Sequence, residues 1–300
     1  MRMDATWHLF RVRARRFDQH GVGHKPKRVG FFELQQNKMK PPRILFSLAT
    51  LLLVCLAGCA SRPSPRTGFS VLVFSKTLMY RHASITNGIA AIQKLGAENH
   101  FHVDATEDAS WFTPANLARY KVVIFLSTSG DILNDEQQAA FREFIERGGG
   151  LVGVHAAVAG DVATEGSWPW YGETLCARFT NHSSIVEATV KVEDSRNPST
   201  AGLPQRWVRK DEWYNFIESP RARVRVLASL DETTYKGGTM GGDHPVVWCK
   251  KVGLGRMWYT ALGHTEVSFT EPLFLQHLLG GIQIAADDKP AEFSPRPNTH

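Results

Sequence analysis

The 300-residue chain has few cysteines, no internal repeat and no apolar run long enough to cross a membrane with ease. Its longest apolar run covers residues 44–57, which is shorter than the roughly 20 residues that a membrane helix needs. Downstream of residue 59 there is also no Cys-x-x-Cys or His-x-x-x-His spacing, the common short signature of a metal site. These absences argue against a repeat protein and against a membrane-spanning segment, and they weaken the case for a metal site.

The first 60 residues have the layout of a secretory leader. Lys40 and Arg43 precede the apolar run, and Leu56-Ala57-Gly58-Cys59 and a polar segment follow it. The Leu-Ala-Gly-Cys ending resembles the bacterial lipobox, which implies that Cys59 is acylated and becomes the mature N-terminus. We therefore expect residues 1–58 to be a leader and signal peptide with its true start at Met39. An uncleaved anchor or a buried helix is the alternative.

A lipid on Cys59 would tie the protein to a membrane. We therefore expect it at the bacterial cell envelope, facing the periplasm or the cell surface. In a Gram-negative cell, the outer membrane is the expected location.

The chain has almost no excess of positive or negative charge once this leader is set aside. The full chain has 35 Lys and Arg against 29 Asp and Glu, but 11 of these basic and 3 of these acidic residues precede Cys59. The remaining 24 basic and 26 acidic residues give a net charge of −2. Nucleic-acid binding depends on a basic surface that neutralises phosphates, so we expect no nucleic-acid partner.

Two cysteines remain beyond Cys59, namely Cys176 and Cys249. An oxidising compartment would allow a disulfide between them. Each stands in an apolar stretch, however, so we expect two buried free thiols.

The rest of the chain suits one domain of ordinary size. Residues 59–68 are rich in Pro, Ser and Arg and predict a flexible tether, residues 69–286 one domain, and residues 287–300 a disordered tail. Strand and helix patterns alternate in the first half, which predicts an α/β fold with a mainly parallel sheet flanked by helices, and the second half is β-rich. Predicted strands cover 69–74, 101–105, 121–126, 151–154, 185–192, 224–230, 245–250 and 256–261, and predicted helices cover 84–95, 134–147 and 273–285.

Several glycine-rich and aromatic segments carry a family resemblance. They include Gly153-Val154-His155-Ala156-Ala157, which ends a predicted strand, and His264-Thr265-Glu266, which follows another. Together with residues 168–172, 211–216 and 241–248, they resemble the trehalose-utilisation, or ThuA-like, family from about residue 71 to residue 284. The resemblance implies a class I glutamine amidotransferase-like (flavodoxin-like) fold and a part in disaccharide use.

Polar residues follow several predicted parallel strands, and ligands bind at the carboxyl ends of such strands. His82 lies after the first strand, Asp131 after the third and His155 directly after the fourth. By resemblance to the amidotransferases, His155 stands at the strand-to-helix elbow that carries their nucleophilic cysteine, and His264 with Glu266 resembles their His-x-Glu pair. A thiol amidase needs a thiolate beside its base, and neither remaining cysteine lies at an elbow, so we exclude glutaminase activity.

Carboxylates decide which reactions a site containing histidines can perform. Asp211 and Glu212 are adjacent, so in an extended chain they point to opposite faces, and we expect one of them to face the site. A glycoside hydrolase would need two carboxylates about 5–9.5 Å apart across the scissile bond. The candidates are Asp131, one of Asp211 and Glu212, and Glu266, and sequence spacing leaves their separation open.

Aromatic side chains near these residues suit the stacking of sugar rings. Trp170, Trp213 and Tyr214 stand among Gly, Asp and Asn without helical periodicity, and we expect them to form a binding wall. The alternative is that these large side chains form core. His82 and His244 are expected to bind substrate beside them.

We therefore expect a lipid-anchored protein that acts on a carbohydrate or glycoside as a glycosidase-type or sugar-modifying enzyme. A catalytically silent carbohydrate-binding module is the alternative, since fold does not imply activity. Metal-dependent chemistry through His155, His244 or His264 is a further alternative, weakened by the missing spacings. The cofactor and the oligomeric state stay open. The expected catalytic residues are His155, His264, Glu266, Asp131 and Glu212, and the expected substrate-binding residues are His82, Asp211, Trp213, Tyr214, Trp170 and His244.

Overall fold

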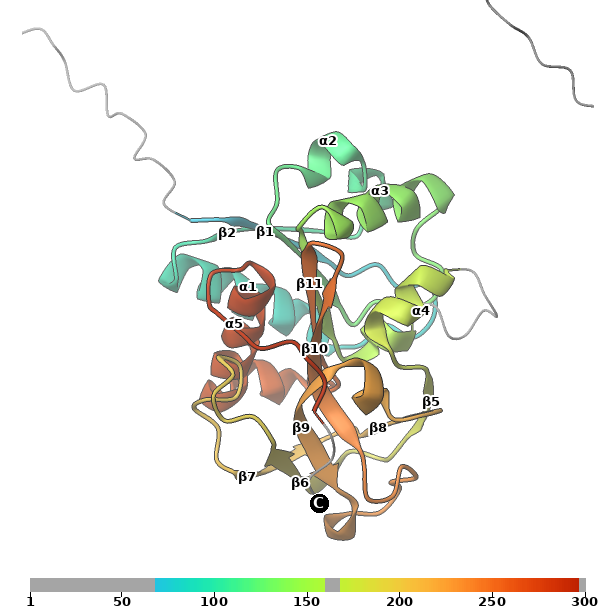
Figure 1. Cartoon of the computed structure of the whole chain (residues 1–300), viewed down its shortest axis with the longest axis vertical. Helices are drawn as coiled ribbons and strands as arrows, with labels where there is room; N and C mark the ends of the chain where they lie inside the picture. Colours follow the sequence, from blue (N-terminus) through green and yellow to red (C-terminus); the bar gives the residue numbers. More distant parts are fainter. Residues whose placement is uncertain (1–67, 160–167, 297–300) are drawn as a thin grey trace, which may run out of the picture. The chain divides into compact units, whose positions relative to one another are not determined.

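Nine strands form one mixed sheet in the order β2-β1-β3-β4-β11-β10-β9-β6-β7 (Figure 1). The computed structural model describes residues 68–159 and 168–296. The strands from β2 to β11 in this order are parallel neighbours, and the remaining neighbours pair antiparallel. The predicted α/β fold with a mainly parallel sheet and a β-rich second half is confirmed. β11, the last strand in the chain, joins the two halves.

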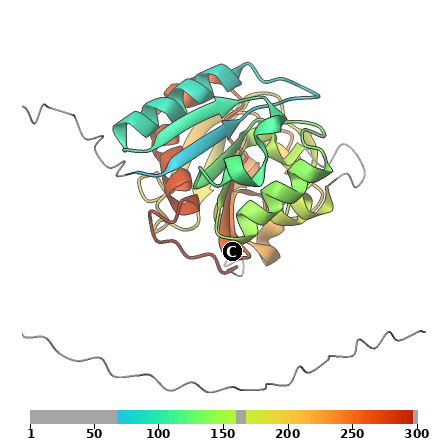
Figure 2. The same ribbon diagram turned by 90° about the horizontal axis from the view of Figure 1, so that it is seen from above.

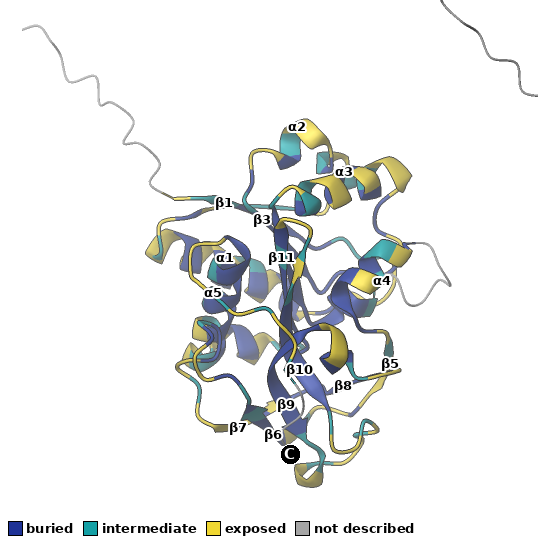
Figure 3. Ribbon diagram, viewed as in Figure 1, coloured by how far each residue is buried: buried dark blue, intermediate teal, exposed yellow. Residues whose placement is uncertain are grey.

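The parallel half is buried between two layers of helices. α1 and α5 cover one face, and α3 and α4 cover the other (Figures 1 and 2). The inner strands carry apolar side chains on both faces and are accordingly buried along their length (Figure 3). The strands of this half are β1 (Ser70–Phe74), β2 (His102–Thr106), β3 (Val122–Leu126), β4 (Gly150–Val154) and β11 (Gly255–Thr260), and the helices are α1 (Ser84–Glu98), α2 (Pro114–Leu117), α3 (Asp135–Glu146), α4 (Pro169–Leu175) and α5 (Pro272–Ala285).

The antiparallel half brings a distant segment back to the centre of the sheet. β10 and β6 run antiparallel to the parallel strands. β7 therefore runs in the same direction as the parallel strands and ends at the same end of the sheet as they do. The Trp207 ring of β7 lies 6.0 Å from the His277 ring of α5, so this half curves toward that helix. The strands are β6 (Val186–Val192), β7 (Arg206–Asp211), β9 (Arg225–Asp231) and β10 (Pro245–Val252), and a separate two-stranded sheet pairs β5 (Phe179–His182) with β8 (Tyr214–Phe216).

Local sequence explains where the helices begin. The Asn134 side chain accepts a hydrogen bond from the Gln137 N–H, and the Gln137 side chain accepts one from the Asn134 N–H, which is the capping box that starts α3. Sequence periodicity missed α4, a short helix that begins at Pro169 directly after Trp168. It also missed α2 and the strands β5, β7 and β8.

Two further predictions can be compared with the structure. Cys176 and Cys249 are free and buried, as expected. Residues 287–296 contain no helix or strand, yet Phe293 packs partly buried against the core beneath the Lys251 ammonium group, 4.8 Å from its ring centre. The predicted leader, the lipid site Cys59 and residues 59–67 of the tether lie outside the described residues. Within the described residues, no helix is long and apolar enough to cross a membrane.

Candidate functional site

A cavity of about 360 Å³ opens at the carboxyl ends of the central parallel strands. His82 follows β1, His155 follows β4, and His264 follows β11, so three strands deliver an imidazole to this edge. Glu212 joins them from the end of β7. One ligand atom from each of these four residues lies within 4.8 Å of the other three. The side chains that line the cavity include Tyr80, His82, Phe179, Glu212, Tyr214 and His264.

His155 occupies the elbow directly after β4. Its φ is +52°, a left-handed conformation that residues other than glycine seldom adopt, so the surroundings must hold it. Its carbonyl accepts a hydrogen bond from the Tyr259 hydroxyl (2.8 Å), and its Nδ1 lies 2.8 Å from the Ala261 carbonyl oxygen. Because a carbonyl oxygen only accepts, Nδ1 carries the proton. The Nε2 of this fully buried ring therefore faces His264 and Glu212.

Asp211 fixes the loop that carries His264. Its completely buried carboxylate accepts hydrogen bonds from the backbone N–H groups of Gly263 (2.9 Å), His264 (3.0 Å) and Glu212 (3.0 Å). The Arg209 guanidinium donates a fourth bond (3.1 Å). With its acceptor sites used in this way, Asp211 positions the site and does not face substrate.

Glu212 is the carboxylate at the centre of the cluster. Its Oε2 lies 3.1 Å from Nδ1 of His264 and 3.5 Å from Nε2 of His155, and its Oε1 lies 3.0 Å from Nδ1 of His182. The two imidazole atoms are themselves 3.2 Å apart. Glu212 thus takes the place beside His264 that the sequence comparison assigned to Glu266.

His82 closes the cluster from the β1 side. Its ring centre lies 4.7 Å from that of His155 and 5.0 Å from that of His264, with both pairs nearly perpendicular. The side chain is only 5% exposed, and its Nδ1 has no hydrogen-bond partner among the described residues. A buried polar atom without a partner is costly, and such atoms often mark a functional site.

The groups of the cluster shift one another's pKa values in different directions. Burial, followed by the nearby imidazoles of His155 and His264, lowers the pKa of His82 to about 3, so this ring is neutral at pH 7. Burial opposes ionisation of Glu212, but hydrogen bonds from His155 and His264 outweigh it and hold the pKa of the carboxyl far below its usual range. Burial also opposes protonation of His264, yet the bond to Glu212 prevails and raises its pKa.

Two acids expected in the site lie elsewhere. Asp131 is exposed in the loop after β3, and Glu266 is exposed at the start of the 3₁₀ helix Glu266–Thr270. Neither lines the cavity or belongs to the cluster around His155 and His264. The pairing of Glu266 with His264 is therefore corrected: a turn separates them, and the acid reaches His264 from β7 instead.

Three expected substrate-binding residues also lie away from the cavity. Trp213 is completely buried, and its Nε1 donates to the Val186 carbonyl oxygen, so the alternative of a core role is the correct one. Trp170 packs on α3 and donates to Glu146. His244 is completely buried, with its ring nitrogens 2.7 Å from a Glu232 carboxylate oxygen and 2.8 Å from the Tyr214 carbonyl oxygen.

A different set of aromatic residues walls the cavity. Tyr214 was expected there, and its ring lies 4.3 Å from His155 and 4.5 Å from Phe179. Tyr80, 65% exposed, stands at the mouth with its ring 4.8 Å from His82. Sequence analysis missed Tyr80 and Phe179. The signal available for Tyr80 was its place beside His82 in the loop after β1.

The family assignment follows from a comparison with protein-family models. The ThuA model, described as trehalose utilisation, matches residues 70–285. The chain belongs to the ThuA family. A comparison with curated proteins finds no match.

Solved structures of ThuA-like proteins share this fold. A Bacteroides uniformis protein described as ThuA-like is 28% identical, with a TM-score of 0.63, and the match covers 74% of this chain and 91% of that one. A second such protein, from Parabacteroides merdae, is 20% identical with a TM-score of 0.61, covering 76% and 94%. A cytoplasmic protein of Salmonella typhimurium LT2 is 10% identical with a TM-score of 0.54, covering 72% and 99%. The latter two show the fold alone.

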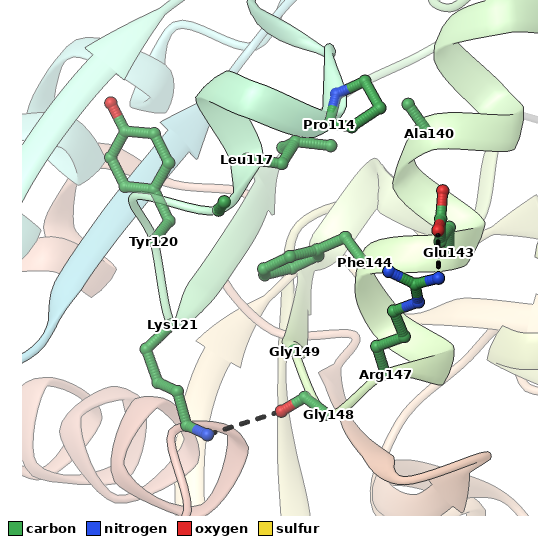
Figure 4. Close-up of a pocket in the computed structure, with 11 residues that line it drawn as sticks. Pro114, Leu117, Tyr120, Lys121, Ala140, Glu143, Phe144, Arg147, Gly148 and Gly149 are labelled. Atoms are coloured by element: carbon green, nitrogen blue, oxygen red, sulfur yellow. Dashed lines mark hydrogen bonds and ion pairs between the residues drawn. The ribbon is translucent and has the colours of Figure 1, made fainter. Parts of the chain in front are cut away.

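This ThuA domain has a second cavity, of about 330 Å³, at the opposite end of the parallel strands, where β3 and β4 begin. Figure 4 shows it between α2 and α3, beside the residues that precede β3 and β4. Its charged groups are engaged: Arg147 pairs with Glu143 (2.8 Å), and the Lys121 ammonium donates to the Gly148 carbonyl (3.4 Å). Both members of the ion pair are largely exposed, so this cavity holds no buried charge of the kind seen around Glu212.

Proposed function

We propose that this protein acts on a carbohydrate or glycoside at the cavity lined by His264 and Glu212, which the buried His155 ring contacts from behind. The observation that carries the proposal is the convergence of three imidazoles and one ionised carboxylate on a single cavity. Aromatic rings on the wall suit the apolar face of a sugar ring. The volume of about 360 Å³ lies at the small end of ligand pockets, which favours one or two sugar units. The family description, trehalose utilisation, points to the same substrate class.

The arrangement favours proton transfer over two-carboxylate hydrolysis. Among the described residues that line the cavity, Glu212 is the only carboxylate, whereas a glycosidase of the usual kind needs two. Imidazoles beside an ionised carboxylate can accept and return a proton near neutral pH. We therefore infer a sugar-modifying reaction in which this centre moves a proton at a hydroxyl group, or at a hydroxyl-bearing carbon beside the carbonyl of an open-chain sugar, where an enediol can take up the electron pair.

Thiol chemistry finds no support in the described residues. The elbow residue is His155, and Cys176 and Cys249 are buried away from the cavity. Burial raises the pKa of the Cys249 thiol to about 12, so no thiolate forms there at neutral pH. The described residues thus lack the thiolate that the glutaminase reaction needs, although the elbow at His155 resembles that of the amidotransferases.

A matched pair of carboxylate variants tests the proposed activity. The full-length protein is incubated in D₂O with a panel of monosaccharides and disaccharides, and turnover and deuterium incorporation are followed by NMR. Glu212→Gln should lower the rate by about 100-fold or more, whereas Glu143→Gln, in the second cavity, should leave it unchanged. Sugar binding without any turnover would favour the silent binding module. No binding to any sugar would refute the carbohydrate proposal.

We also propose that the protein is a lipoprotein anchored through Cys59. Only the lipobox-like sequence supports this, because residues 1–67 lie outside the described part. Mass spectrometry of the native protein should find a mature chain that begins with an acylated Cys59. A native chain that retains residues 1–58, or one released from membranes by salt alone, would contradict the proposal.

A further inference from the structure

The donor atoms of the cluster are spaced like the ligands of a metal ion. The three distances among Nε2 of His155, Nδ1 of His264 and Oε2 of Glu212 are 3.2, 3.5 and 3.1 Å. In a tetrahedral zinc site with bonds of about 2.0–2.1 Å, neighbouring ligand atoms are about 3.3 Å apart. The triangle therefore matches one face of such a tetrahedron.

The hydrogens available cannot satisfy these three atoms. His155 donates its Nδ1 proton to the Ala261 carbonyl oxygen, so its Nε2 can face the Glu212 carboxylate favourably only if that atom carries a second proton or binds a cation. His264 can direct its Nδ1 proton at only one of these two acceptors. Either an additional proton or a cation must lie among them, because two lone pairs facing each other in a buried site repel.

The surroundings of the triangle are those of metal ligands. A ligating histidine typically donates its second ring N–H to a carbonyl or carboxylate, as His155 does to Ala261. The outer oxygen of Glu212 is held by His182, and the His264 backbone is held by Asp211. These contacts fix the orientation of each donor before any ion arrives.

His82 supplies an independent observation that points to the same place. It is 95% buried, since only 5% of the residue is exposed, and its Nδ1 has no partner in the described part of the chain. One of its ring nitrogens lies within 4.8 Å of a ligand atom of each of the other three residues. A buried imidazole that packs against the triangle and has an unpartnered nitrogen is explained if the group that completes the site is a cation.

We propose that His155, His264 and Glu212 bind a divalent transition-metal ion, with His82 beside the fourth position. Neutral imidazoles and a carboxylate are the ligands that suit zinc and its neighbours in the first transition row. The three ligands come from three separated segments, so no short spacing in the sequence predicts them. A metal held there could polarise a sugar oxygen in the cavity, which extends the proposed function without depending on it.

Metal binding is tested on the full-length protein without any sugar. The protein is stripped with a chelator, and Zn²⁺ alone is titrated against it by calorimetry and by competition with a chromogenic chelator. We expect about one ion per chain and a raised Tm on binding. X-ray absorption at the zinc edge should show nitrogen and oxygen neighbours at about 2.0–2.1 Å, including imidazole rings.

Variants identify the ligands. Glu212→Gln, His155→Gln and His264→Gln should each weaken zinc binding by more than about 100-fold. His102→Gln is the matched control, because His102 also lies 3.0 Å from a carboxylate, that of Asp104, but at an exposed position. The control should bind zinc as the wild type does.

The outcomes separate this proposal from the proposed function. No zinc binding by wild-type protein that remains folded, or undiminished binding in the folded His155→Gln and His264→Gln proteins, would overturn the metal site. The X-ray absorption measurement keeps the test valid if a variant fails to fold, since sulfur ligands or an ordinary hydrated ion would also overturn it. Sugar turnover that persists without metal would leave the proposed function standing.

Discussion

Two cavities of similar size lie at opposite edges of the same sheet, and they differ in how their charged groups are held. The cavity at the carboxyl ends surrounds Glu212 with buried imidazoles, whereas the cavity at the amino ends in Figure 4 has an exposed ion pair between Glu143 and Arg147. Concavity alone is therefore a poor guide to function. Buried groups whose hydrogen-bonding capacity is not used up distinguish the first cavity.

The largest expected difference between the two cavities is in how much a substitution beside each of them lowers the stability of the protein. Asp211→Ala removes four hydrogen bonds and takes the nearest carboxylate from the 2%-exposed Arg209 side chain, whose remaining polar contacts are the Ser268 hydroxyl (2.7 Å) and the more distant Glu271 carboxylate (3.4 Å). We expect a loss of about 3–5 kcal/mol in the free energy of unfolding, measured by urea denaturation. Glu143→Ala, at the other edge, should cost less than about 0.5 kcal/mol because its ion pair is exposed. Equal losses in both variants would contradict this account.

A second contrast compares two buried histidines. His277 in α5 donates from Nδ1 to the Ser199 carbonyl oxygen (2.7 Å), and its Nε2 accepts from the Thr260 hydroxyl (3.2 Å), so its neutral ring is fully satisfied, unlike that of His82. Burial lowers the pKa of His277 to about 4, against about 6.5 when unfolded.

The sign of the resulting pH dependence follows from these two pKa values. Above pH 6.5 both states of His277 are neutral, and its contribution to stability is complete. Between pH 6.5 and pH 4 the unfolded chain takes up a proton that the folded protein does not, so up to about 3 kcal/mol is lost. Urea denaturation across this range should show a smaller acid loss in His277→Gln than in the wild type. An identical pH slope in the two proteins would show that His277 does not titrate as described.

The smallest expected effect concerns the mouth of the carboxyl-end cavity. Tyr80→Ala removes a ring that is 65% exposed, so stability should hardly change. If the ring stacks on sugars, affinity should fall several-fold, since such a contact is worth about 1 kcal/mol. Leu254→Ala removes a side chain that is at least as accessible (74%) but does not line the cavity, and it should alter neither stability nor sugar affinity. Calorimetric titration of each variant with a sugar that the wild-type protein binds measures this difference in affinity.

The central parallel strands and the histidines at their ends were predictable because both depend on local patterns. A run of apolar residues predicts a buried strand; His155 directly follows one such run, and His264 comes shortly after the end of another. The alternation of an extended chain also predicted that only one of Asp211 and Glu212 would face the cavity. The same alternation, carried two residues further, places Tyr214 with Glu212 and Trp213 with Asp211, which would have excluded Trp213 from the binding wall.

The acid partner of His264 could not be predicted in the same way. Glu266 is two residues from His264 in sequence, but the turn into a 3₁₀ helix carries it to the surface. Glu212 is 52 positions away and arrives because the antiparallel half curves back until β7 meets the end of β11. Such a meeting depends on strand order, twist and packing against α5, which no short segment encodes.

The position of β11 has a consequence for how the chain is made. This strand is the last to be synthesised, yet it pairs with β4 on one side and β10 on the other. Until residue 260 has emerged, each of those strands presents an open edge, and open edges invite pairing with other chains. Premature termination before β11 should therefore yield aggregating fragments. The nascent chain depends on its closing segment for both solubility and a completed site.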